Sequence, residues 1–100
     1  MERFTEPALL LLLREQPTHG YDLLERLPEL TGESRVEMGN LYRLLRALEE
    51  EGLVVSEWRD GKRTYAITER GRQLLDQWAE ALRTSQARTQ TFLERYERGR

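Results

Sequence analysis

The side chains that could do chemistry are basic, and they gather at two places in the chain. Arg43 and Arg46 lie one turn apart on the polar face of a segment with helical periodicity. Arg59, Lys62 and Arg63 surround a predicted tight turn. A guanidinium can bond guanine through two N–H groups at once, and any of these cations can contact phosphate. These positions therefore indicate nucleic-acid binding, with a solvated surface as the alternative.

Two further residues extend this pattern. Asn40 lies near the start of the same predicted helix, where side chains reach bases, and Asn suits adenine; simple solvation is the alternative. Arg35 adds another cation, yet the whole chain has 16 basic and 18 acidic residues and a net charge of −2. Because DNA-binding domains are usually basic overall, such a function must depend on this local patch.

Catalytic and metal-binding side chains are scarce. The chain has no cysteine and a single histidine, His19. Thiolate metal sites, cysteine nucleophiles and zinc sites with two histidines are therefore excluded within one chain. We predict that the protein is not an enzyme and uses no metal or cofactor. The longest apolar run, Ala8–Leu13, is far shorter than the ~20 residues of a membrane span. We expect a cytoplasmic protein with no membrane partner.

Three helices are predicted in the first half of the chain. Leucine is the commonest residue and favours helices, so the chain should be mainly α-helical. The first helix ends at Pro17, and the second begins at Thr18 as its cap and stops at Pro28. The third runs from about residue 37 to 51 and carries one apolar stripe, formed by Leu41, Leu44, Leu45 and Leu48.

A β-hairpin is predicted next. The dipeptide Asp60-Gly61 between two extended segments is a strong signal for a two-residue type I′ turn. This turn sets a register that pairs Arg59 with Lys62, Trp58 with Arg63, Ser56 with Tyr65 and Val54 with Ile67. Three helices followed by such a ribbon are the layout of a winged helix-turn-helix, whose third helix enters the DNA major groove.

One long helix, about 45 Å in length, is predicted over residues 69–98. Its a/d spacing predicts a seam that binds a second copy of the chain, formed by Leu75, Trp78, Leu82, Ser85, Thr89, Phe92 and Tyr96. We divide the chain into a winged-helix DNA-binding domain, residues 1–68, and a C-terminal dimerisation helix, residues 69–98. A winged helix that binds only protein is the alternative. The acidic run 49–51 favours that alternative, and if DNA binds, this run should face away from it.

Three motifs resemble those of the PadR transcriptional regulators, in order and with matching spacing over about residues 8–75. The first is His19-Gly20-Tyr21-Asp22-Leu23, which is similar to the His-Gly-Tyr-Glu-Leu signature of that family. The second covers residues 39–54 and resembles the recognition-helix signature. The third matches the wing and the closure that follows it, through Trp58, Tyr65, Thr68 and Gly71.

The resemblance implies a sequence-specific DNA-binding regulator, and we expect a repressor that acts as a homodimer on a palindromic operator. It implies that Tyr42 and Tyr21 donate hydrogen bonds to phosphates, with packing between helices as the alternative for both. It also implies a single C-terminal dimerisation helix. Trp78 is then a candidate side chain for a small flat aromatic effector, with a purely structural interface as the alternative.

Overall fold

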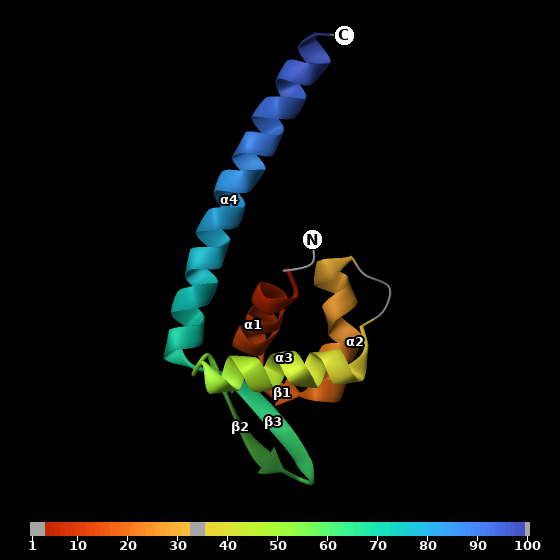
Figure 1. Cartoon of the computed structure of the whole chain (residues 1–100), viewed down its shortest axis with the longest axis vertical. Helices are drawn as coiled ribbons and strands as arrows, with labels where there is room; N and C mark the ends of the chain where they lie inside the picture. The colour runs from red at the N-terminus through yellow and green to blue at the C-terminus, as the bar shows by residue number, and fades with distance from the viewer. Residues whose placement is uncertain (1–3, 33–35, 100) are drawn as a thin grey trace.

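The computed structural model describes residues 4–32 and 36–99. In chain order its elements are α1 (Thr5–Glu15), β1 (Thr18–His19), α2 (Gly20–Thr31), α3 (Met38–Glu50), β2 (Val54–Arg59), β3 (Lys62–Ile67) and α4 (Glu69–Arg98). Figure 1 shows three short helices together, a hairpin at one end, and α4 projecting toward the other end as a long rod. The predicted mainly helical winged helix with a long C-terminal helix is confirmed.

The helix α1 is the centre of the hydrophobic core. Five consecutive leucines, Leu9 to Leu13, place apolar side chains on every face of this helix, so other elements must surround it. Four of the five are at most 2% exposed. The elements α2, β3 and α4 each pack against α1, and their apolar side chains complete the core, among them Leu23, Leu27, Tyr65, Ile67 and Leu75.

The helix α3 buries one face and exposes the other. Leu41, Leu45 and Leu48 are fully covered, and Leu44 is partly covered at the edge of the same stripe. The predicted apolar stripe is therefore confirmed. Its burial turns the polar face of α3 outward, which is the face that carries Asn40, Arg43 and Arg46.

The hairpin has the predicted register. Trp58 lies opposite Arg63, and the pairing continues to Val54 and Ile67. Asp60 and Gly61 have φ angles of 49° and 77°. Positive φ at both central residues is what a type I′ turn requires. The turn therefore sets which side chains of the hairpin face α3.

A third strand, β1, lies outside the prediction. It pairs with the free edge of β3, with Thr18 opposite Tyr65 and His19 opposite Thr64. The prediction that Thr18 caps α2 is wrong, because Thr18 is taken up by this strand. His19 is the cap instead, and its Nδ1 accepts a hydrogen bond from the Asp22 N–H at 3.3 Å.

The helix α2 continues past Pro28, although the sequence predicts that this proline ends it. Proline lacks an N–H group, but its carbonyl still accepts hydrogen bonds. The Pro28 carbonyl accepts from the Gly32 N–H at 3.0 Å. Gly32, with φ of 75°, then ends the helix in the left-handed conformation.

The start of α4 is joined tightly to the turn that follows α3. The Thr68 hydroxyl donates to the Gly52 carbonyl at 2.7 Å and accepts from the Gly71 N–H at 3.0 Å. The Thr68 N–H donates to the Leu53 carbonyl at 3.1 Å. A Cβ atom on Gly71 would lie 2.1 Å from the same Leu53 oxygen. Only glycine permits this approach of the two backbones.

The rest of α4 projects away from the winged helix formed by residues 4–68, which we call the head. Leu75 is 7% exposed and belongs to the core of its own chain, instead of the expected seam with a second copy, because the first turns of α4 pack on α1. Trp78 and Leu82 are half-buried, and every residue from 83 to 99 is exposed. The molecule is consequently 59 Å long.

We predict that Gly71→Ala lowers the free energy of unfolding by about 3 kcal/mol or more, because the new methyl group collides with a backbone carbonyl that cannot rotate away. Chemical denaturation followed by circular dichroism measures this loss. The matched control is Gly39→Ala, since a Cβ at Gly39 meets nothing within 4 Å and should stabilise α3 by up to about 1 kcal/mol. Equal stability of Gly71→Ala and the wild type would contradict the close contact.

Candidate nucleic-acid interface

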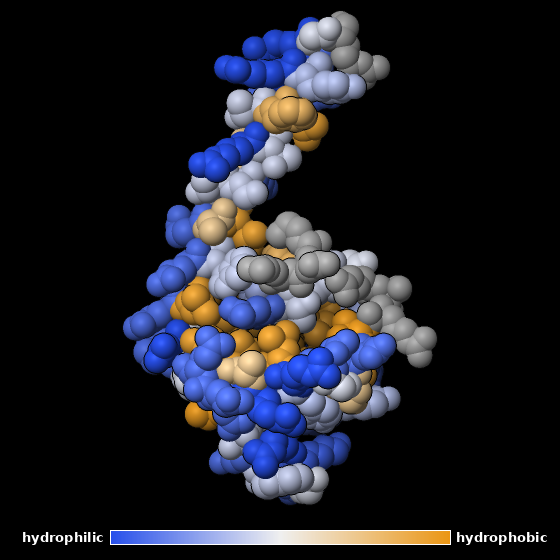
Figure 2. Space-filling model, viewed as in Figure 1, coloured by the Kyte–Doolittle hydropathy of each residue, from blue (hydrophilic) through white to orange (hydrophobic). Residues whose placement is uncertain are grey.

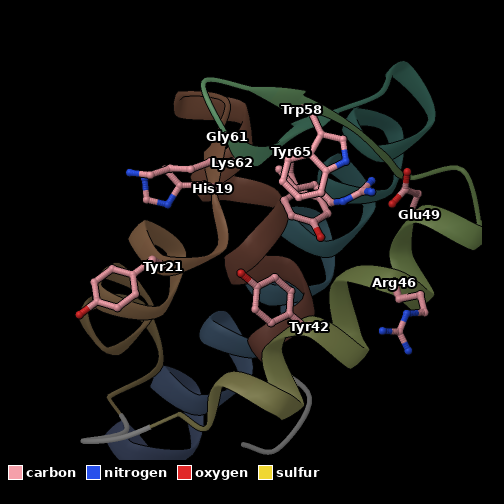
Figure 3. A pocket seen from close by; sticks show the side chains of 10 residues that line it. His19, Tyr21, Tyr42, Arg46, Glu49, Trp58, Gly61, Lys62 and Tyr65 are labelled. Carbon is pink, nitrogen blue, oxygen red and sulfur yellow. The ribbon is translucent and has the colours of Figure 1, made fainter.

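A groove of about 760 Å³ separates α3 from the hairpin. Its lining comes from β1, α2, α3 and the hairpin and is mostly aromatic and basic (Figure 3): His19, Tyr21, Tyr42, Arg46, Glu49, Trp58, Gly61, Lys62, Arg63 and Tyr65. Five of the nine residues predicted to contact nucleic acid line this groove. The structure thus brings the predicted recognition helix and the predicted wing to one surface.

Two further predicted residues lie on the exposed face of α3. Asn40 and Arg43 are both exposed. The Arg43 Nη1 donates to the Asn40 Oδ1 at 3.5 Å, a weak contact across one helical turn. Neither side chain is held by the core, so both can turn toward an external partner.

Tyr42 packs against the start of α2 and still reaches the groove. A Cβ atom on Gly20 would lie 2.8 Å from the Tyr42 hydroxyl oxygen, so the tyrosine ring occupies the space that a side chain there would need. Tyr42 remains 39% exposed, and its hydroxyl points into the groove (Figure 3). Packing and hydrogen-bond donation, stated as alternatives for Tyr42, are therefore compatible. Tyr21 lies at the groove edge and points away from Tyr42.

The hairpin cations differ in their partners. The Arg59 Nη2 lies 2.7 Å from Oε1 of the Glu57 carboxylate, which partly neutralises this arginine. Within the described residues, 4–32 and 36–99, four cations form no ion pair: Lys62, Arg63, and Arg43 and Arg46 of α3. Those four cations can therefore meet an external anion without first breaking a salt bridge. The predicted contact Arg35 lies outside the described residues.

Glu49 occupies the groove, contrary to the expectation that residues 49–51 all face away from a bound duplex. Its two carboxylate oxygens lie 3.1 and 2.9 Å from the Ser56 hydroxyl, which joins α3 to β2. Helical spacing could have revealed this, since Tyr42, Arg46 and Glu49 follow one another at intervals of four and three on one face. Glu50 and Glu51 are exposed, as expected.

The floor of the groove includes the buried phenol of Tyr65, which is 4% exposed. Burial raises the pKa of Tyr65, because loss of hydration disfavours the phenolate. The Arg63 charge opposes this rise, and the Glu49 charge adds to it. Tyr65 is therefore uncharged at neutral pH and contributes shape rather than charge to the groove.

Metal-binding and membrane-spanning features are not found in the part of the chain that the structure describes. No group of three or more His, Asp or Glu side chains there could hold a metal ion. No helix among those residues is long and apolar enough to cross a membrane.

A second surface lies on α4. Phe92, Leu93 and Tyr96 are 68%, 48% and 59% exposed, and Figure 2 shows apolar atoms interrupting the hydrophilic surface of the projecting rod. Nearer the head, Trp78 and Leu82 border a groove of about 260 Å³ between α1 and α4. Of the remaining predicted seam, Ser85 and Thr89 are exposed. The Thr89 hydroxyl donates to the Ser85 carbonyl within the helix at 2.9 Å.

Comparison of the sequence with protein families finds one match, to the model described as "Transcriptional regulator PadR-like family", over residues 9–77. This segment contains α2, α3, the hairpin, most of α1 and the start of α4. It therefore covers both the groove and the junction at Gly71. The comparison with curated proteins found no match.

Solved structures give the same fold. A PadR family transcription regulator from Clostridium difficile R20291 superposes with a TM-score of 0.81 at 18% identity, covering 90% of this chain and 98% of the other. A PadR family regulator from Eggerthella lenta has a TM-score of 0.70 at 30% identity, covering 85% and 80%. Bacillus subtilis PadR in complex with operator DNA has a TM-score of 0.67 at 29% identity. That match covers 77% of this chain and 47% of the longer PadR chain.

We predict that the free energy of unfolding of Tyr65→Phe falls less above about pH 10 than that of the wild type. The pKa of Tyr65 in the folded chain lies above its ordinary value of 10.0. Between the two values the unfolded chain has lost a proton that the folded chain keeps, so the free energy of unfolding falls as pH rises. Urea denaturation at about pH 8 and about pH 10.5 measures the fall. Tyr21→Phe, at an exposed tyrosine, is the control and should behave like the wild type. An unchanged fall in Tyr65→Phe would contradict burial of this phenol.

Proposed function

Because the chain belongs to the PadR-like family of transcriptional regulators, we propose that it represses transcription as a homodimer bound to a palindromic operator. Family membership makes it a DNA-binding regulator rather than an enzyme. The observation that carries the proposed mode of DNA binding is the groove between α3 and the hairpin. There, cations that have no ion-pair partner among the described residues lie beside aromatic side chains. We place its action in the cytoplasm.

In this proposal α3 enters the major groove of duplex DNA, which is wide enough to admit a helix. The exposed face of α3 supports this docking, since Asn40, Arg43 and Arg46 project from it and can reach base edges. Lys62 and Arg63 then lie toward the flanking phosphates, and Tyr42 can donate its hydroxyl to a phosphate between helix and wing. This arrangement explains how a chain with a net charge of −2 can bind a polyanion such as DNA. Its positive charges are concentrated on α3 and the wing, so the surface that meets DNA is locally positive.

Dimerisation through α4 is supported by its unpartnered apolar side chains. Phe92, Leu93 and Tyr96 project from a rod that no other element of the described chain covers. A second copy can cover them with its own α4 or with its groove between α1 and α4, and two-fold symmetry then presents two α3 helices to successive half-sites. Trp78 borders that groove and stays partly exposed. It is the side chain on which we place a small flat aromatic effector, with a structural interface as the alternative.

The experiment that tests DNA binding is selection of bound sites from a pool of random duplexes. We expect paired half-sites whose centres lie about 10 base pairs apart or a multiple of that distance, because two symmetric recognition helices must meet the same face of the duplex. Failure to enrich any sequence, together with absence of salt-dependent binding, would instead favour a winged helix that binds only protein.

We predict distinct effects for a base contact and a phosphate contact. Arg43→Ala should weaken the selected site by about 1–3 kcal/mol and relax preference at one base pair. Lys62→Ala should weaken all duplexes alike and reduce the slope of affinity against salt by about one unit. Fluorescence anisotropy at several salt concentrations measures both. Arg83→Ala is the control, because Arg83 is an exposed residue of α4 that pairs with Glu80. Wild-type binding by both test variants would move the DNA surface elsewhere.

We predict that replacing Phe92 and Tyr96 together by Ser weakens the dimer by at least about 3 kcal/mol, because symmetry removes four aromatic side chains from the interface. Sedimentation velocity should show a shift from dimer to monomer at micromolar concentration. The helical signal should also fall, since an isolated helical rod is marginal without packing. Glu94→Ser, on the other face of the heptad, is the control. A double variant that stays dimeric would exclude this seam.

A further inference from the structure

Three side chains connect the recognition helix to the far strand of the wing. The Ser56 hydroxyl on β2 donates to the Glu49 carboxylate on α3, at 2.9 Å from the nearer oxygen. Arg63 on β3 donates from Nη1 to the same Ser56 oxygen at 2.8 Å. We call these contacts the Glu49–Ser56–Arg63 network. The Trp58 ring adds a further restraint, since its centroid lies 5.2 Å from the Arg63 guanidinium carbon.

The strand register explains why Arg63 lies across the hairpin. Arg63 is directly opposite Trp58, and Ser56 is two residues before Trp58 on the same face. A diagonal neighbour of this kind is within reach of a long side chain. The Arg63 side chain therefore reaches across the hairpin to Ser56 while it remains exposed to solvent. Glu49 and Arg63, the two outer members of the network, both line the groove.

The charge of Glu49 strengthens the hold on Arg63 through Ser56. A serine hydroxyl has one hydrogen, and Ser56 donates it in the hydrogen bond to the Glu49 carboxylate, so the lone pairs of the Ser56 oxygen are free to accept from the Arg63 guanidinium. Hydrogen bonds in such a series polarise one another. Glu49 thus acts on Arg63 without touching it, as shown by the absence of an Arg63–Glu49 ion pair among the described residues.

The same carboxylate is unfavourable for a DNA backbone. Among the described residues that line the groove, Glu49 alone carries a negative charge. A phosphate that enters between α3 and the wing must approach this charge. It must also draw the Arg63 N–H group away from Ser56 before it can bond that arginine fully.

From this geometry we infer that Glu49 is a positioning residue that restrains Arg63 in the free protein and lowers the affinity of the chain for any DNA duplex. The inference rests on the proposed DNA-binding function. Glu49 competes with phosphate for Arg63, so the wing engages a duplex only when the phosphate outweighs the network. The Glu49–Ser56–Arg63 network therefore lowers the affinity for DNA of any sequence. A larger share of the binding free energy must then come from contacts of α3.

The test compares Glu49→Gln with Glu50→Gln on a random-sequence duplex and on the selected site. Glu49→Gln keeps an acceptor for Ser56 but removes the charge, whereas Glu50 is an exposed neighbour outside the groove. We expect Glu49→Gln to bind both duplexes about two- to fivefold more tightly. Its salt slope should steepen by about 0.9, the value of one added phosphate contact. Glu50→Gln should stay close to the wild type.

A double-mutant cycle with Arg63→Ala separates restraint of Arg63 from plain repulsion of phosphate. If Glu49 acts through Arg63, the gain from Glu49→Gln should fall below half when Arg63 is absent. A gain that persists in full without Arg63 would overturn the inference, and so would a Glu49→Gln variant that behaves like Glu50→Gln while the wild type binds DNA. A wild-type chain that binds neither duplex would overturn the proposed function and this inference together.

Discussion

Burial of α1 from every side is the interaction on which the other elements depend. A helix of consecutive leucines cannot lie at a surface, so α2, β3 and α4 each contribute apolar side chains around it. This packing holds α3 by way of α2 and the hairpin by way of β3, and so sets the width of the groove between them. It also draws Leu75 into the core, which fixes the base of α4. One buried helix therefore positions both the proposed DNA surface and the proposed dimer surface.

The parts of the fold that could be predicted from the sequence are those with local signals. The turn at Asp60-Gly61 sets the strand register without help from the rest of the chain, and the leucine stripe decides which face of α3 is buried. The wrong predictions have two other causes, namely contacts between distant segments and short segments without a periodic signal. Pairing of β1 with β3 and burial of Leu75 are contacts between segments distant in sequence. A strand of two residues, or a proline such as Pro28 one turn before a helix end, carries no periodicity to interpret.

The composition of the candidate site was predictable, but its internal contacts were not. The sequence indicates which cations belong to α3 and to the wing, and the fold brings Arg46, Lys62 and Arg63 to one groove. It does not indicate that Arg59 pairs with Glu57 while Arg63 reaches Ser56. Those choices depend on which strand face each side chain occupies and on what α3 places opposite it. Glu49 is the clearest case, since its role follows only from the approach of α3 to β2.

The junction at Gly71 couples the direction of α4 to the position of α3. Contact between the backbones of Gly71 and Leu53, together with the hydrogen bonds of Thr68, joins the start of α4 to the turn that follows α3. In a dimer held by the far ends of two such rods, a tilt of about 5° over a length of about 45 Å moves each head by about 4 Å. That displacement is close to the rise of one base pair, about 3.4 Å. In such a dimer, a small change in the angle between the two α4 helices would therefore shift each α3 helix by about one base-pair step along the DNA.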